Sequence, residues 1–442
     1  MQQTNTSTEA ILARLKIKAL NEMQEASLAA SREEKDMILL SATGSGKTLA
    51  FLLPLVQSFD KDNKNTQALI IVPSRELALQ IDQVFRSMAT GFKITCCYGG
   101  HLRETEENNL IQPPALIVGT PGRLGDHLRR GNITTHTITT LVLDEFDKSL
   151  ELGFVEEMEF IIKSLPAIQK RVLTSATETV EIPDFIGLTT PVKLNFLDHE
   201  NENSAGLAVQ TLLSDNKDKL ETLFNLICYL GNRSMIIFCN HREAVERTSN
   251  YLSEKSINNE FYHGGMEQQQ RDSSLCKFRN GSTNVLVTTD LAARGLDIPN
   301  IRYIIHYHLP DTEATYTHRN GRTARMDASG TAILLYSEGE KLPDYLPETA
   351  EELTLPENSP LPEKPKWVTL FIAAGKKDKV NKIDIVGFLT QKGELKKEDI
   401  GLIEVKDYFA FVAVRKAHVN KLLHQIKDER IKNKKVRIDV AK

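Results

Sequence analysis

The sequence predicts an α/β protein with two parallel-sheet domains in tandem and a small α+β domain at the C-terminal end. One observation is a series of short apolar runs at residues 37–41, 68–72, 94–98, 115–119, 140–144 and 171–175. A second series follows at residues 234–238, 284–288, 302–306 and 331–336. Amphipathic segments separate most of these runs, and buried strands that alternate with helices are typical of parallel sheets covered on both faces. The third observation is the predicted order strand, helix, strand, strand, helix, strand after Trp367, which is typical of ferredoxin-like folds.

Two polar segments divide the chain. Residues 198–206, "DHENENSAG", form the expected hinge between the parallel-sheet domains. Residues 341–366 are rich in Pro and Glu, so we expect a linker there that forms neither helix nor sheet. The expected domains are therefore residues 1–197 and 207–340, followed by the linker at 341–366 and the small domain at 367–442.

Composition and charge narrow the class of protein. The 442 residues are 40% hydrophobic and 26% charged, which excludes a disordered or fibrous chain. No apolar run reaches the ~18 residues of a membrane span and the N-terminal residues do not form a signal peptide, so we expect a soluble, cytoplasmic protein. Five cysteines without a C-x-x-C pair indicate reduced thiols.

Charge is distributed unevenly. The net charge is -4, yet Lys and Arg outnumber Asp and Glu by 18 to 10 from Trp367 to Lys442. A basic terminal domain on an acidic body suggests an attachment that binds a polyanion. A lysine-rich solvated surface is the alternative interpretation.

The run "LLSATGSGKT" passes from an apolar strand into a Gly-rich loop and then into a helical pattern. Backbone N–H groups of such a loop wrap phosphates, Lys47 can reach the terminal phosphates, and Thr48 can ligate Mg²⁺. The strict pattern requires glycine where this chain has Ser41, and a short Gly/Ser/Lys string alone is often a surface loop. The strand before it and the helix after it favour a nucleotide site made by Thr43, Gly44, Ser45, Gly46, Lys47 and Thr48.

Three carboxylates crowd the stretch "LDEFDKS" at the end of a later apolar run. Like charges at this spacing repel unless a cation shares them. A Mg²⁺–triphosphate supplies that cation, so Asp144 is predicted to hold the metal, partly through water, and Glu145 to orient and deprotonate the attacking water. Without the Gly-rich loop upstream, the preferred interpretation of this heptapeptide would be an acidic turn at the end of a strand.

The motifs "SATGSGKT", "PSRELA", "TPGR", "LDEFD", "SAT", "TTDLAARGLDI" and "HRNGRTAR" occur in the order and approximate spacing of the DEAD-box ATP-dependent RNA helicases. The resemblance covers residues 20 to 340. It implies two RecA-like domains that close over ATP on one side and over single-stranded RNA on the other. It also implies that Arg322 and Arg325 act as arginine fingers, that Asp297 helps complete the nucleotide site, and that Ser175, Thr177 and His318 couple the site to strand separation.

The resemblance implies RNA contacts that go mostly to the sugar–phosphate backbone, which predicts sequence-blind, salt-dependent binding. In the first domain the matching positions are Pro73, Arg75, Gly99, Gly100, Thr120, Pro121 and Arg123. In the second domain they are Asn240, Gln268, Arg271, Thr288 and Gly295.

The sequence departs from the family pattern at three places. Phe146 replaces the alanine of the name motif, and we expect it to change packing and not chemistry. Asp327 stands where glycine is usual. Gln24 matches the glutamine that pairs with adenine, but Leu20, Asn21 and Glu22 replace the Pro-Thr-Pro before it, so hydrolysis is better supported than strict adenine preference.

The C-terminal segment resembles the RNA-binding domain of DbpA-type bacterial helicases through "GKKDK", "DIVGFLT", "EDIG" and "KNKKVRI". That resemblance implies binding to a structured segment of large-subunit ribosomal RNA. Phe371 and Phe409 are candidates for stacking on bases, with core packing as the alternative. The candidate phosphate contacts are Lys376, Lys377, Lys379, Lys432, Lys434, Lys435 and Arg437.

Together with the predicted nucleotide site, these resemblances imply an RNA-dependent ATPase that uses ATP and Mg²⁺ to unwind RNA, with a function in large ribosomal subunit assembly. An ATP-regulated RNA clamp or annealing factor that separates strands poorly is the alternative. A DNA helicase is disfavoured by the RNA-type module. The family default is a monomer.

Overall fold

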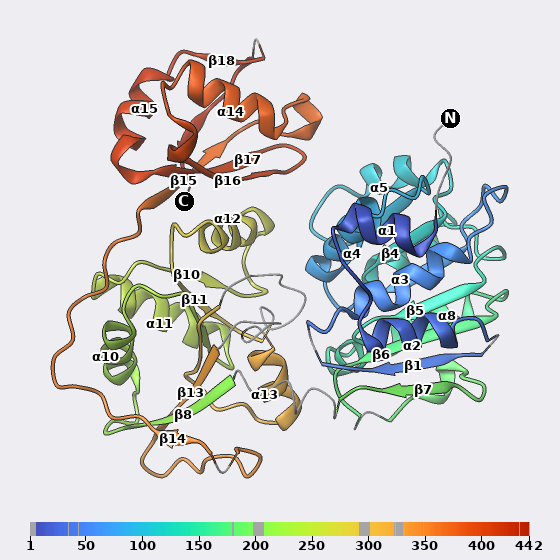
Figure 1. Cartoon of the computed structure of the whole chain (residues 1–442), viewed down its shortest axis with the longest axis horizontal. Coiled ribbons are helices and arrows are strands. Elements are labelled where there is room, and N and C mark those ends of the chain that lie inside the picture. The colour runs from blue at the N-terminus through green and yellow to red at the C-terminus, as the bar shows by residue number, and fades with distance from the viewer. Residues whose placement is uncertain are drawn as a thin grey trace. The chain divides into compact units, whose positions relative to one another are not determined.

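The computed structural model describes residues 6–33, 35–42, 44–178, 181–197, 207–290, 301–321, 323, 330–347, 349–432 and 434–441. The chain divides into two compact units, made mainly of residues 1–205 and 206–442 (Figure 1). No helix within the described ranges is long and apolar enough to cross a membrane.

A seven-stranded parallel sheet forms the centre of the first unit, in the order β3-β4-β2-β5-β6-β1-β7. Its strands are β1 Met37–Leu40, β2 Ala68–Ile71, β3 Ile94–Cys97, β4 Leu116–Gly119, β5 Thr140–Leu143, β6 Lys170–Ser175 and β7 Val192–Asn195. The first six lie within the apolar runs of the sequence or overlap them. The seventh was not predicted, because its side chains are only partly buried or exposed and leave no apolar run.

Helices cover both faces of this sheet, as the continuous apolar strands predict. They are α1 Thr8–Leu15, α2 Glu22–Ala30, α3 Lys47–Gln57, α4 Arg75–Ser87, α5 Arg103–Leu110, α6 Pro121–Arg129, α7 Phe146–Glu151 and α8 Val155–Lys163. Strand β2 shows the alternation: Ala68 and Ile70 share an apolar cluster with α3 and α4, whereas Leu69 and Ile71 share one with α6 and α8.

The second unit contains another parallel sheet, in the order β10-β11-β9-β12-β13-β8-β14. Its strands are β8 Leu207–Ser214, β9 Met235–Phe238, β10 Asn259–Tyr262, β11 Val285–Thr288, β12 Tyr303–His306, β13 Gly330–Ser337 and β14 Glu351–Glu352. Its helices are α10 Leu220–Leu230, α11 Arg242–Glu254, α12 Gln268–Arg279 and α13 Glu313–Asn320. The four predicted runs form β9, β11, β12 and β13, whereas β8, β10 and β14 were not predicted.

Part of the segment 341–366 is packed against the second unit, although its composition predicts a linker without regular structure. Glu351 and Glu352 form β14, which pairs in parallel with Gln210 and Thr211 of β8. Leu353 and Leu355 also pack against the apolar core of this unit. The expectation that the segment forms no sheet is therefore wrong at β14, because backbone pairing at a free sheet edge needs no apolar pattern in the added strand.

The C-terminal module has the predicted order of elements. Strands β15 Trp367–Ile372, β16 Ile400–Val405, β17 Ala410–Arg415 and β20 Ile438–Val440 form an antiparallel sheet in the order β16-β17-β15-β20. Helices α14 Lys382–Gln391 and α15 Val419–Gln425 connect them, and a small hairpin, β18 Arg430–Ile431 and β19 Lys434–Lys435, precedes β20. The predicted fold class, two parallel-sheet domains and a small α+β domain, is confirmed.

Candidate functional site

The order of strands in the first sheet separates the sequence motifs into two neighbouring groups. The segments with Pro73, Gly99 and Thr120 follow β2, β3 and β4, which are adjacent. The Gly-rich loop, Asp144 and the Ser175 segment follow β1, β5 and β6, which are also adjacent. Since carboxyl ends of parallel strands open at one edge of a sheet, the nucleotide-type and RNA-type motifs share that edge and meet between β2 and β5.

The Gly-rich loop has the backbone that phosphate binding requires. Gly44 and Gly46 both have φ of 95°, a conformation that favours glycine, and Gly46 begins α3. The Nζ of Lys47 donates to the carbonyl of Ser41 at 2.6 Å. Ser41 continues the strand pattern because its N–H donates to the carbonyl of Ser175 at 3.1 Å. Serine therefore fits where the strict motif has glycine.

The segment before α2 contacts this loop directly. Asn21 caps α2, and its Nδ2 donates to the carbonyl of Ser45 at 2.9 Å. Gln24 accepts from the N–H of Asn21 at 3.1 Å through Oε1 and donates to the carbonyl of Gly46 at 3.3 Å through Nε2. A Cβ at Gly46 would lie 2.5 Å from that Nε2, so a larger residue there would displace the amide of Gln24, and the φ of 95° itself favours glycine. Although the preceding Pro-Thr-Pro is absent, Gln24 and Asn21 lie against the Gly-rich loop.

The acidic motif is buried at the end of β5. Asp144 is 3% exposed and accepts a short hydrogen bond from the hydroxyl of Thr174, which in turn accepts from the N–H of Glu145 at 3.2 Å. Burial raises the pKa of Asp144, although Thr174 and the charge of Lys47 oppose that effect. Glu145 has φ of 50° and ψ of 48° and lies at the start of α7. Phe146, 2% exposed, packs into the apolar cluster beneath the motif.

A third acid links this motif to the segment after β6. Asp147 is fully buried and accepts from the hydroxyl of Thr177 at 3.2 Å. The hydroxyl of Ser175 donates to the carbonyl of Thr177 at 2.7 Å and accepts from its N–H at 3.0 Å. Hydrogen bonds therefore connect the acidic motif to Ser175 and Thr177.

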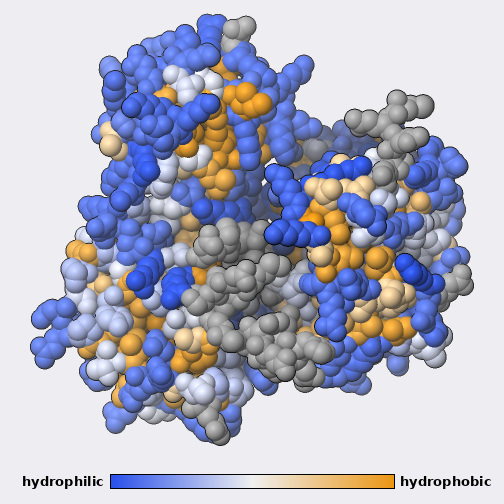
Figure 2. Space-filling model, viewed as in Figure 1, coloured by the Kyte–Doolittle hydropathy of each residue, from blue (hydrophilic) through white to orange (hydrophobic). Residues whose placement is uncertain are grey.

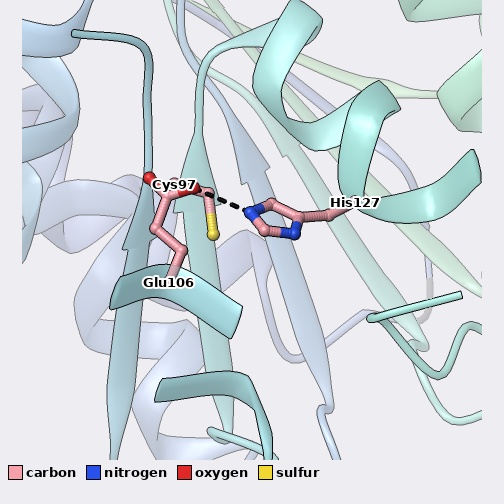
Figure 3. A group of neighbouring side chains, drawn as sticks. All are labelled: Cys97, Glu106 and His127. Atoms are coloured by element: carbon pink, nitrogen blue, oxygen red, sulfur yellow. Dashed lines mark hydrogen bonds and ion pairs between the residues drawn. The ribbon is translucent and has the colours of Figure 1, made fainter. Parts of the chain in front are cut away.

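Glu106 joins the RNA-type motifs into one network. Its Oε1 accepts from the N–H of Tyr98 at 2.8 Å and contacts Nε2 of His101 at 3.0 Å. Its Oε2 accepts from Nη1 of Arg123 at 2.9 Å and contacts Nε2 of His127 at 2.7 Å (Figure 3). The guanidinium of Arg75 lies 4.6 Å from the ring centroid of Tyr98. One carboxylate thus joins the segments after β3 and β4, and Arg75, after β2, reaches this network through the ring of Tyr98.

The same cluster has the residue types of a metal site, because ligand atoms of Cys97, Glu106 and His127 lie within 4.8 Å of one another. The arrangement favours hydrogen bonding instead. Four donors already occupy the oxygens of Glu106, one of them the cationic Arg123, and burial raises the pKa of Cys97, which disfavours the thiolate. The amide of Asn132 contacts Nδ1 of His127 at 3.0 Å, which leaves Nε2 as the nitrogen that donates to Glu106.

The Glu106→Gln variant is expected to lose about 2 kcal/mol of stability near neutral pH, because an amide cannot accept from all of these donors. Burial raises the pKa of Glu106, but hydrogen bonds from His101, His127 and Tyr98 and the charge of Arg123 lower it overall to about 2. The stabilisation is present above the ordinary pKa of 4.5 and is lost as the pH falls toward 2. Urea unfolding at several pH values should show the variant and the parent converging in acid.

The control for this measurement is Glu104→Gln, an exposed carboxyl on the same helix α5. It should leave stability within ~0.5 kcal/mol of the parent. A constant difference between Glu106→Gln and the parent across the acid range would contradict the predicted ionisation of Glu106.

The second sheet also gathers predicted residues at one edge. Asn240 follows β9, Thr288 ends β11, and Gln268 and Arg271 lie in the first turn of α12, which follows β10. The hydroxyl of Thr288 donates to the carbonyl of Tyr262 at 2.7 Å. His318 is buried in α13. Thr43, Gly295, Asp297, Arg322 and Arg325 lie outside the described residues, as does Asp327.

Arg319 is the centre of this edge, although the sequence did not single it out. Its guanidinium is 1% exposed and contacts both carboxylate oxygens of Asp290, at 2.6 and 3.1 Å. It also donates to the carbonyl of His308 at 2.9 Å and to Oδ1 of Asn240 at 2.8 Å. Because the planar guanidinium donates to three separate loops at once, it fixes the backbone around Asn240.

The lysines predicted for the C-terminal module lie in two adjoining segments. Lys376, Lys377 and Lys379 follow β15, and Lys432, Lys434, Lys435 and Arg437 lie in or beside the β18–β19 hairpin. The Nζ of Lys432 donates to the carbonyl of Lys379 at 2.7 Å, and Lys434 contacts Asp378 at 2.9 Å, which joins the two segments. Both aromatic candidates, Phe371 and Phe409, are half-buried on the sheet.

Several functional candidates were missed at the level of sequence. Asn21 carries a signal, because Asn followed three residues later by Gln is a capping pattern. Glu106, Thr174 and Arg319 carry none, because their partners lie on other segments that only the fold brings together.

Comparisons with known proteins agree with this geometry. Residues 21–185 match the family model for the DEAD/DEAH box helicase, residues 218–327 the helicase conserved C-terminal domain, and residues 369–440 the DbpA RNA binding domain. The chain is 34% identical over 429 residues to the ATP-dependent RNA helicase DbpA of Escherichia coli, covering 95% of this chain and 94% of that protein. It is 30% identical to the DbpA of Bacillus subtilis, covering 95% and 94%.

Solved structures show the same fold. S. cerevisiae Dbp5 bound to RNA and ADP BeF3 aligns with a TM-score of 0.65 and 27% identity, covering 75% of this chain and 88% of that one. The helicase Mss116 bound to ssRNA and UDP-BeF aligns with a TM-score of 0.64 and 26% identity, covering 74% and 72%. The two parallel-sheet domains of this chain are thus RecA-like in fold.

Proposed function

Because this chain belongs to the DEAD-box ATP-dependent RNA helicases, with a C-terminal module of the DbpA type, we propose that it remodels ribosomal RNA during assembly of the large ribosomal subunit. It is an RNA-dependent ATPase that binds ATP and RNA. The observation that carries the proposal is the presence, on one chain, of the helicase motifs and of a module whose resemblance implies a structured segment of that RNA. The protein acts in this proposal as a cytoplasmic monomer, the default of its family.

The donor set at the end of β5 and β1 fits Mg²⁺. The hydroxyl of Thr48 and the carboxylate of Asp144 are hard oxygen ligands, and burial, which raises the pKa of Asp144, disfavours its charged form unless a cation shares the site. The metal would neutralise phosphate charge and bring bound water to the site. Within this arrangement Thr174 and the backbone of β5 orient Asp144, and Lys47 is released from the carbonyl of Ser41 to a terminal phosphate.

Glu145 is the proposed base for the attacking water. Its backbone at the start of α7 is left-handed, and the residue is 6% exposed, which limits competition from bulk water. The N–H of Glu145 and the carboxylate of Asp144 both hydrogen-bond to the hydroxyl of Thr174. This shared partner fixes the position of the proposed base relative to the proposed metal ligand.

Hydrolysis and RNA binding are coupled, in this proposal, through the contacts between Asp147 and Thr177. Loss of the terminal phosphate changes the charge beside Asp144 and shifts the acidic motif, which the hydrogen bond to Thr177 passes to the segment after β6. The fingers Arg322 and Arg325, with Asp297, complete the site from the second domain by motif position. Their removal would leave phosphoryl charge unshielded at a cost of ~10³ to 10⁵ in rate.

The ribosomal proposal is tested by competition with the full chain. Binding of the full chain to a labelled large-subunit ribosomal RNA is measured, and unlabelled ribosomal or unrelated structured RNA of equal length is added as competitor. The proposal expects ribosomal RNA to compete at least tenfold better. Equal competition by unrelated RNA would contradict it, and retention of RNA without displacement of a duplex would favour the clamp.

The Lys434→Ala variant tests where the module binds. Removal of one phosphate contact should reduce the slope of log affinity against log salt by about 0.7 to 0.9. Lys421→Ala, a lysine of α15 outside the candidate set, is the matched control and should keep the parent slope. Equal slopes for both variants would exclude Lys434 from the RNA contact.

A further inference from the structure

Residues 341–347, named here the strap, join two anchored points of the second helicase domain. Before the strap, the carboxylate of Glu340 contacts the Nζ of Lys219 at 2.8 Å. Lys219 is 3% exposed and also donates to the carbonyl of Leu335 at 3.1 Å. After the strap, β14 pairs with β8 at the edge of the sheet. The strap is therefore held at both ends.

Tyr345 joins the strap to two other elements of this domain. Its side chain is half-buried, whereas Lys341 and Asp344 are exposed. Its hydroxyl donates to the carbonyl of Pro310 at 2.6 Å, and burial raises the pKa of Tyr345 to about 12, so the hydroxyl keeps the proton that it donates. The centroid of its ring lies 5.4 Å from that of Tyr316. One side chain thus contacts both the loop after β12 and α13.

The loop after β12 belongs to the network of Arg319. The carbonyl of His308 accepts from the guanidinium of Arg319 at 2.9 Å. The carbonyl of Leu309 accepts from Nδ2 of Asn240 at 3.4 Å. The next carbonyl is the one that Tyr345 binds. Three consecutive carbonyls of this loop are therefore bonded to three different segments of the domain.

Tyr316 extends the contact along α13. Its ring centroid lies 5.5 Å from that of His306, with 25° between the ring planes. His306 is fully buried, and burial together with the charge of Arg319 lowers its pKa to about 3. The imidazole is therefore neutral, and its Nε2 donates to Oδ1 of Asn320 at 3.0 Å. Since Asn320 is the last residue of α13, contacts run from the strap to the end of this helix.

Arg322, a predicted finger, follows α13 closely in the chain. Gly321 caps the helix after Asn320. On the other side of Arg322, the hydroxyl of Thr323 donates to the carbonyl of Ile301 at 2.6 Å. Because Arg322 is bonded to Gly321 and Thr323 in the chain, the position of the helix end determines where its side chain starts.

We propose that Tyr345 is a positioning residue for ATP hydrolysis, because it fastens α13 to the loop after β12 and so fixes the point from which Arg322 extends. This inference rests on the proposed function, since motif position assigns the finger. The composition of the strap predicts a linker, and a linker would have no effect on hydrolysis. Packing that stabilises the domain without affecting hydrolysis is the alternative.

The solvent side of the strap provides control positions. Figure 1 shows the chain before β14 in the lower part of the second unit, near α13. In Figure 2, hydrophilic and hydrophobic residues are interspersed on that part of the visible face. The exposed side chains of Lys341 and Asp344 contact each other at 2.8 Å. Substitution of Asp344 therefore changes the strap without removing the contacts of Tyr345.

The first test measures the hydrogen exchange of α13 amides in the full chain without ATP or RNA. Loss of the contacts with Pro310 and Tyr316 should make local opening of the helix easier. Exchange in α13 should therefore be at least about tenfold faster in Tyr345→Ala and unchanged in Asp344→Asn. Parent-like exchange in Tyr345→Ala would show that the strap does not hold α13, and would overturn the inference.

The second test determines kcat and the KM for ATP separately, at saturating RNA. Misplacement of a reacting group by ~1 Å can cost about 10²-fold in rate, so Tyr345→Ala should lower kcat about 10- to 100-fold. The KM for ATP should change less than about threefold, because the Gly-rich loop lies in the first domain. Tyr345→Phe keeps the ring and loses one neutral hydrogen bond, so its kcat should stay within about fivefold of the parent.

A double variant tests whether Tyr345 acts through the finger. In single-turnover measurements, Tyr345→Ala should lower the rate by less than about twofold when Arg322 is already replaced by Ala, because an absent finger cannot be misplaced. Effects that multiply would show that Tyr345 acts in another way, and would overturn the positioning role.

Controls separate positioning from unfolding. Cys239 is fully buried in the same domain, and its alkylation should stay slow in every variant. Tyr345→Leu, which keeps an apolar side chain, is measured in parallel and should show the same fall in kcat. Parent-like kcat in both Tyr345 variants, with a slow Arg322→Ala, would overturn only this inference. Parent-like kcat in Arg322→Ala would overturn the finger of the proposed function as well.

Discussion

The Glu145→Gln variant is expected to hydrolyse ATP about 10²- to 10⁴-fold more slowly in the presence of saturating RNA, while still binding ATP and RNA. The amide keeps the size of the side chain but cannot take a proton from water. The backbone of Glu145 is held by Thr174, so the substitution should not disturb the position of Asp144. Steady-state hydrolysis and equilibrium binding of a fluorescent ATP analogue measure the two effects.

Glu156→Gln is the matched control, because Glu156 is an exposed carboxyl in the first turn of α8, the helix that follows α7. It should retain the parent rate. Hydrolysis by Glu145→Gln within tenfold of the parent would show that another group activates the water. A parallel loss of ATP binding would instead indicate a structural effect.

The Asp290→Ala variant is expected to destabilise the second helicase domain by about 3 to 5 kcal/mol. It removes the carboxylate that faces Arg319 and leaves a guanidinium that is 1% exposed without its counter-charge. The loops of Asn240 and His308 would lose their common anchor as that guanidinium moves toward water. Exposure of Cys239 in urea, followed by thiol labelling, reports the unfolding of this domain separately from the first.

Asp311→Ala serves as the comparison, because Asp311 is exposed and contacts the outer amide of Asn240 at 3.4 Å, and not the guanidinium of Arg319. It should cost less than ~0.5 kcal/mol. If Asp290→Ala cost less than ~1 kcal/mol, the guanidinium would have to find other partners in the folded domain, and Arg319 would not be the anchor described.

In the first sheet, the nucleotide-type motifs and the RNA-type motifs follow two different groups of adjacent strands, and only the tertiary structure shows this grouping. The sequence places the Gly-rich loop first and the acidic motif about a hundred residues later, with RNA-type motifs between them. The strand order β3-β4-β2-β5-β6-β1-β7 separates the two groups and brings Thr174 onto Asp144. Sequence order alone gives no such neighbours, because crossover connections allow any two parallel strands to become adjacent.

By itself, the sequence determined the fold class, the Gly-rich loop, the acidic motif and the family, because apolar periodicity and phosphate-binding chemistry are local properties of the chain. Only the tertiary structure decided the partners of Glu106, the anchoring of Asn240 by Arg319, and the contacts of the C-terminal module with α12. Several of these contacts join residues far apart in the chain: Arg123 and Glu106 are 17 positions apart, Arg319 and Asn240 are 79 apart, and Arg279 and Glu404 are 125 apart. A burial pattern cannot distinguish a ring that stacks on a base from one that packs on a helix, because both require an apolar ring on the outer face of a strand.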